Sequence, residues 1–133
     1  MALKRILMAA CGALALFALV TPSAMADTDV KKEIATAEAH AGFAAGGADL
    51  KAVQMHLHHV VNCLVGPKGK GFDASQANPC KDQGNGVMPD YKGKQKKALQ
   101  QALDTTRAGL KATDLAVAKQ KASDAEMLLK KVM

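Results

Sequence analysis

Apolar residues recur at intervals of three and four in two segments of the first half of the chain, which places them on one face of a helix. In residues 29–45 they are Val30, Ile34, Ala37, Ala41 and Ala44. Between Asp49 and the Gly66-Pro67 stop they are Leu50, Val53, Leu57, Val60, Val61 and Leu64. Gly46-Gly47 separates the two segments, so the pattern predicts an antiparallel helical pair joined by a short turn.

The second half of the chain repeats this arrangement. One helix is predicted over residues 94–110, with Leu99, Ala102, Leu103, Thr106 and Leu110 on its inner face. Another begins at Thr113 or Asp114, with Leu115, Ala118, Ala122, Ala125, Leu128, Leu129 and Val132 inward. Residues 66–93 show no periodicity and are rich in Gly and Pro. We therefore expect an all-α fold, a four-helix up-down-up-down bundle with a long loop between its second and third helices.

The N-terminus has the three parts of a secretory signal peptide. Lys4 and Arg5 precede an apolar run over residues 6–20, and Ala24-Met25-Ala26 supplies the small-x-small pattern of a cleavage site. We expect residues 1–26 to be a signal peptide and residues 27–133 to form the bundle domain, in the periplasm or outside the cell. No later stretch predicts an integral membrane segment.

Cys63 and Cys80 are the two cysteines that follow the predicted cleavage site. An even pair in an oxidising compartment predicts a disulfide, which here would clamp the loop 66–93 to the second helix. Closing a loop of about 18 residues stabilises a fold by roughly 3 kcal/mol. Such a crosslink suits a small core that is rich in alanine and poor in aromatic residues.

All four histidines lie in the first helical pair, His40 in its first helix and His56, His58 and His59 in its second. If the chain turns near Gly47, His40 lies about 10 Å and His56 about 13 Å from the turn. His56 and His58 flank the apolar face on opposite sides, whereas His59 points away from the core. One of the two flanking residues should therefore meet His40, and the hand of the bundle decides which.

This juxtaposition predicts a transition-metal site built from His40 with His56 or His58, and His59, Met55 and Glu33 are further possible donors. Imidazole with a thioether suits copper, and imidazole alone also suits nickel or zinc. The alternative is that the histidines are ordinary half-exposed residues that bond to carbonyl groups or water.

The string Ala37-Glu38-Ala39-His40-Ala41-Gly42-Phe43-Ala44 resembles the repeat of the small metal-binding proteins of the bacterial periplasm. The likeness covers about residues 30–62 and implies a helical-bundle metal scavenger or buffer. Those proteins repeat histidines through the whole bundle, whereas the third and fourth helices here have none. The resemblance therefore implies one or two metal sites rather than high-capacity storage.

Other functions have less support in the sequence. A cofactor-free bundle could bind another periplasmic protein through the loop 66–93 and its neighbouring lysines. A b-type haem could sit between His40 and either Met127 or a second histidine. We expect no enzyme, because the chain lacks a nucleophile motif and the H-E-x-x-H motif.

The net charge of the predicted mature chain is modest. Without Lys4 and Arg5 the 18 basic residues become 16 against 12 acidic ones, a net charge of +4. With no arginine cluster or aromatic platform, we expect no nucleic-acid partner.

Overall fold

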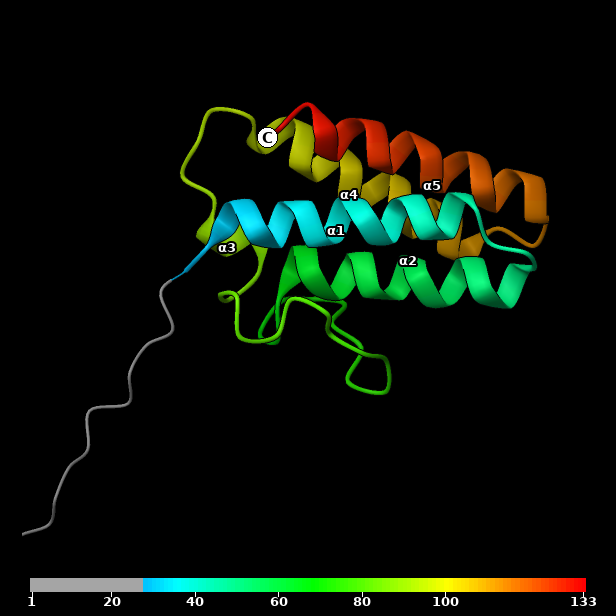
Figure 1. Ribbon diagram of the computed structural model, residues 1–133, viewed down its shortest axis with the longest axis horizontal. Helices are drawn as coiled ribbons and strands as arrows, with labels where there is room; N and C mark the ends of the chain where they lie inside the picture. Colours follow the sequence, from blue (N-terminus) through cyan, green and yellow to red (C-terminus); the bar gives the residue numbers. More distant parts are fainter. Residues whose placement is uncertain (1–27) are drawn as a thin grey trace, which may run out of the picture.

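In a computed structural model, the described residues 28–133 form five α-helices and no strand (Figure 1). Four helices are long: α1 (Val30–Ala45), α2 (Leu50–Val65), α4 (Lys96–Lys111) and α5 (Leu115–Lys130). The fifth, α3 (Val87–Asp90), is a single turn. The predicted signal peptide, residues 1–26, lies outside the described residues. Within residues 28–133, the helices all fall short of the length and apolar character needed to cross a membrane.

Three of the four long helices begin at an aspartate that caps the helix. The side chains of Asp29, Asp49 and Asp114 accept hydrogen bonds from backbone N–H groups in the first turns of α1, α2 and α5. The chain leaves α2 through Gly66, whose φ of +70° lies in the left-handed region. A β-carbon at Gly66 would also collide with the carbonyl oxygen of Asn85, so this position requires glycine.

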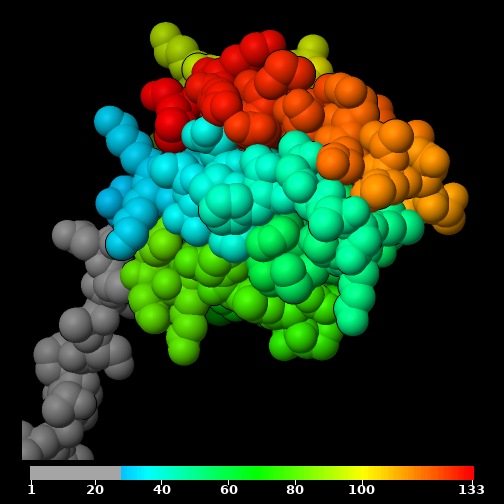
Figure 2. Space-filling model, turned by 45° about the vertical axis from the view of Figure 1, so that its right-hand side comes forward, coloured from blue at the N-terminus to red at the C-terminus, as the bar shows by residue number. Residues whose placement is uncertain are grey.

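The helix α1 packs against α2 and α5, and α4 packs against the same two helices (Figure 1). A smaller contact joins α2 to α5. The helices α1 and α5 contact each other, and each carries three fully buried alanines, whose small side chains suit close approach of helices. These residues are Ala37, Ala41 and Ala44 on α1 and Ala118, Ala122 and Ala125 on α5. Figure 2 shows the surface of α1 between α2 and its following loop on one side and α5 on the other. The predicted all-α class is confirmed.

The core follows the predicted apolar faces and contains the predicted disulfide. Cys63 and Cys80 are bonded, with their Cα atoms 5.1 Å apart, and both are buried. The bond ties residues 66–80 to the last turn of α2. A disulfide of this kind is typical of exported proteins.

The loop 66–93 differs from the prediction because it contains α3. This turn places Val87 in the core, where it is fully buried, and it begins after Gly86 at φ +111°. Four residues are too few to show a helical period in the sequence, so only packing of Val87 against the core reveals the turn. Residues 28–133 therefore contain five helices rather than the four predicted.

Candidate metal centre

The turn at residues 46–49 brings one histidine of α1 against two of α2. The Nδ1 atom of His40 lies 3.2 Å from Nδ1 of His56 and 3.3 Å from Nδ1 of His59. One possible ligand atom from each residue can be chosen so that all three lie within 4.8 Å of one another. The three imidazoles therefore form one cluster, which we call the histidine triad.

The directions of the side chains explain why His59 belongs to the triad. His56 and His59 are three residues apart, so they project from α2 about 60° apart, on the side that faces α1. Side chains on a helix lean toward its N-terminus. In two helices that run in opposite directions, His40 leans away from the turn while His59 leans toward it. The two rings therefore converge, although the backbones of His40 and His59 lie at different distances from the turn along the helix axes.

Nδ1 of His40 is close to two ring nitrogens at once. A neutral imidazole nitrogen has one in-plane position, which holds either a proton or a lone pair. Nδ1 of His40 can therefore form one well-directed hydrogen bond, either to His56 or to His59. The histidine that is not bonded then lies against this nitrogen without a hydrogen bond of good geometry. A cation between the three nitrogens would use all three lone pairs.

Burial favours the neutral form of two members of the triad, His40 and His59. None of the three rings is fully exposed. Desolvation, followed by the neighbouring His59 and His56, lowers the pKa of His40 to about 4. Desolvation and the neighbours His56 and His58 also lower the pKa of His59. Metal ions bind the neutral imidazole, so at neutral pH these two ligands need not first lose a proton.

An aromatic ring lies against the triad. The ring of Phe43, one turn after His40 on α1, has its centre 5.5 Å from those of His40 and His56. It meets His40 edge-on and remains 57% exposed. A large apolar side chain at an exposed position reduces the access of water to the two imidazoles beside it. This role of Phe43 was not predicted, although its i, i+3 spacing from His40 is visible in the sequence.

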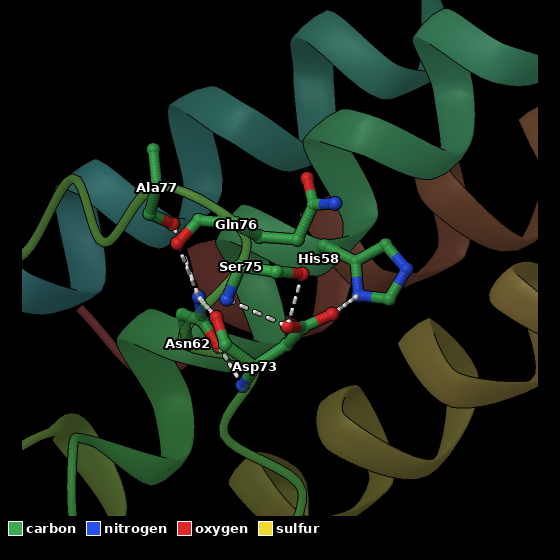
Figure 3. Close-up of polar contacts among 6 residues, drawn as sticks. All are labelled: His58, Asn62, Asp73, Ser75, Gln76 and Ala77. Carbon is green, nitrogen blue, oxygen red and sulfur yellow. Dashed lines mark hydrogen bonds and ion pairs between the residues drawn. The ribbon is translucent and has the colours of Figure 1, made fainter.

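His58 lies apart from the triad and faces a different partner. Its Nδ1 atom is 3.6 Å from a carboxylate oxygen of Asp73, and both side chains are about one-third exposed (Figure 3). Hydrogen bonds from the hydroxyl and the backbone N–H of Ser75 lower the pKa of Asp73. The order His58–Asp73–Ser75 puts the carboxylate in the middle, whereas activation of a serine nucleophile needs the histidine there.

The buried residue Asn62 was missed by the sequence analysis. Its amide donates to the carbonyl oxygens of Asp73 (2.9 Å) and Ala77 (3.0 Å), and its side-chain oxygen accepts from the Asp73 N–H (2.9 Å). Figure 3 shows these bonds joining α2 to the loop. An asparagine inside an apolar run, next to Cys63, was the available signal, because a buried amide must find partners.

The predicted helper residues are placed elsewhere. Glu33 is fully buried, and one of its carboxylate oxygens accepts a hydrogen bond from the N–H of Gly86, 2.9 Å away. It precedes His40 by two turns of α1. Met55 is 41% exposed and lines a surface groove together with His58. Cys63 is held in the disulfide, so it offers no thiolate. The ligand set that the structure assembles is therefore composed of imidazoles.

Comparisons with models of known protein families, with curated proteins and with solved structures gave no match. Within residues 28–133, the features that point to a function are thus three histidines at metal-ligand distances, on helices of a fold that contains the Cys63–Cys80 disulfide.

Proposed function

We propose that this protein binds one transition-metal ion through His40, His56 and His59, on an exported four-helix bundle of the up-down-up-down type. The observation that carries the proposal is the convergence of three imidazoles from α1 and α2, with Nδ1 separations of 3.2 and 3.3 Å from His40. The role that fits such a site is binding of the ion, as a buffer, scavenger or chaperone, rather than catalysis.

The spacing of the nitrogens supports metal coordination. Metal–nitrogen bonds of about 2.0–2.1 Å at tetrahedral angles place two ligand nitrogens about 3.3 Å apart. Both nitrogen pairs that involve His40 are within 0.1 Å of this spacing. The two separations from His40 therefore already match those of nitrogens that share one ion.

The chemistry of the donors narrows the class of metal. Three imidazoles without a thiolate suit copper, nickel or zinc, and do not suit calcium or magnesium, which prefer oxygen ligands. Three protein ligands also leave one position of a tetrahedral ion for water or for a ligand from another molecule. A site with an exchangeable position is suited to releasing its ion to a partner, which a buffer or chaperone requires.

Calorimetric titration of the purified, disulfide-intact protein with Cu(II), Ni(II) and Zn(II) tests the proposal. At least one of these ions should bind with a stoichiometry of one per chain. Losing an outer-shell partner of a metal ligand typically costs 10–100-fold in affinity. Losing a ligand should cost at least as much, so His59→Gln should weaken binding at least about tenfold.

His58→Gln is the matched control, because His58 is the neighbouring histidine on the same helix but faces Asp73. This variant should keep the wild-type stoichiometry, and its affinity should change by less than about twofold, or less than about 0.5 kcal/mol. Circular dichroism should confirm that both variants retain their helix content. Equal losses in the two variants, or tight binding that survives both His40→Gln and His59→Gln, would contradict a site at the triad.

A further inference from the structure

A second concave site lies between the loop that follows α2 and the side of α4. The groove has a volume of about 550 Å³, which is within the usual range for small-molecule sites. Its lining combines apolar and basic side chains: Val65, Met88 and Leu103, with Lys68, Lys70 and Arg107. None of these residues belongs to the histidine triad.

The apolar part of the groove is fixed by the core. Val65 ends α2, Met88 lies on α3 and Leu103 lies on α4. Val65 is 7% exposed and Leu103 is 4% exposed, and both belong to the main core cluster, against which Met88 packs. Because three separate elements hold these side chains, the apolar wall exists before any ligand arrives.

Arg107 presents a guanidinium that is held in place without a counter-charge. It is half-buried, and one of its N–H groups donates to the carbonyl oxygen of Lys70, 2.8 Å away. Gly71, at φ +94°, lies against the guanidinium so closely that a β-carbon there would be 3.0 Å from it. Among residues 28–133, no carboxylate forms an ion pair with Arg107. Its other N–H groups therefore remain available to an anion.

The one acidic residue in the lining does not supply that anion. Both carboxylate oxygens of Asp90 accept hydrogen bonds from Asn85, one from its backbone N–H at 2.6 Å and one from its side chain at 3.2 Å. Asp90 thus braces the loop. Three basic groups and one carboxylate leave the lining with a net charge of +2.

We propose that this groove binds a small amphipathic organic anion. The apolar body of the ligand lies on Val65, Met88 and Leu103, and its carboxylate pairs with Arg107, with Lys68 and Lys70 at the exposed rim. A planar guanidinium can donate two parallel hydrogen bonds to a carboxylate, which fixes the orientation of the ligand. A neutral apolar ligand would leave Arg107 unpaired, and a small polar anion would leave the apolar wall in contact with water.

Three ligands that separate head from body test the proposal, with binding to ¹³C-methyl-labelled protein followed by NMR. Decanoate at concentrations below its micelle threshold should bind one per chain and shift the methyl signals of Val65, Met88 and Leu103. Decanol, which lacks the charge, and acetate, which lacks the body, should each bind at least about tenfold more weakly, as expected for loss of a charge-assisted hydrogen bond or of the buried chain. Arg107→Gln should weaken decanoate binding by a similar factor.

Lys97→Gln is the matched control, because Lys97 is an exposed cation on the same helix that does not line the groove. It should leave decanoate affinity unchanged within about twofold, or about 0.4 kcal/mol. A parallel sedimentation with phosphatidylglycerol vesicles separates a free anion from a membrane surface. Equal affinity for decanoate and decanol, no effect of Arg107→Gln, shifts confined to other methyl groups, or co-sedimentation with vesicles without any response to decanoate would each overturn the proposal.

Discussion

Replacing Asn62 with alanine should lower the free energy of unfolding by about 3 kcal/mol. The side chain is fully buried and makes three hydrogen bonds of 2.9–3.0 Å to the backbone of Asp73 and Ala77. Each such bond contributes about 1 kcal/mol net, and the alanine variant also leaves backbone groups of the loop without partners. Because small domains are stable by only about 5–15 kcal/mol, this loss is a large share of the total.

Asn62→Asp tests the same contacts through their dependence on pH. The new carboxylate can still accept a hydrogen bond from the Asp73 N–H. Its second oxygen, however, replaces the Asn62 NH₂ group and faces the carbonyl oxygens of Asp73 and Ala77, to which that group donates in the native protein. Burial and these oxygens disfavour its charged form, so its folded-state pKa should lie above the ordinary value of about 3.9. The unfolded chain then loses its proton first as the pH rises, and the deficit relative to wild type grows from pH 4 to pH 7.

Urea unfolding followed by circular dichroism at 222 nm measures both variants. Asn85→Ala is the control, because Asn85 is an exposed asparagine of the same loop whose side chain makes one bond of 3.2 Å. It should cost less than about 1 kcal/mol. A loss below about 1 kcal/mol for Asn62→Ala, or a smaller deficit for Asn62→Asp at pH 7 than at pH 4, would refute the view that these bonds hold the loop on α2.

Two further predictions concern titrating groups. The pKa of His40, about 4, lies below the ordinary value of 6.5, so its neutral form stabilises the fold above about pH 6.5 and this contribution is lost as the pH falls toward 4. In metal-free protein, NMR titration should find the midpoint of His40 near pH 4. Between pH 6.5 and pH 4, the wild-type protein should lose more stability than His40→Phe. A midpoint near pH 6.5 would show that burial does not lower the pKa of His40. Burial, with Asp90 and Asp29 nearby, raises the pKa of Glu33, so its charge destabilises the fold as the pH rises. Glu33→Gln keeps an acceptor for the Gly86 N–H and should raise the melting temperature at pH 8 but not at pH 4. A higher melting temperature at pH 4 alone would contradict this prediction.

Much of the fold could be predicted from the sequence because its signals are local. The apolar period of the long helices, the aspartate caps and the glycine stops act within a few residues of each other. The pairing of Cys63 with Cys80 follows from there being two cysteines after the predicted cleavage site. The turn α3 and the amide of Asn62 were missed because their partners lie in segments that carry no period of their own.

The sequence alone did not determine which histidines of α2 would meet His40. The sequence alone placed four histidines on two neighbouring helices at similar distances from one turn, so that a meeting of His40 with a residue of the next helix followed from helix geometry. It could not choose the side of α2 on which α1 packs, because that side is set by how all the long helices fit together. The tertiary structure puts α1 on the side of His56 and His59 and leaves His58 to the loop, where it faces Asp73. The physical reason is that the position of a side chain around its own helix is fixed by the sequence, whereas its neighbour across an interface is fixed by the packing of the whole core.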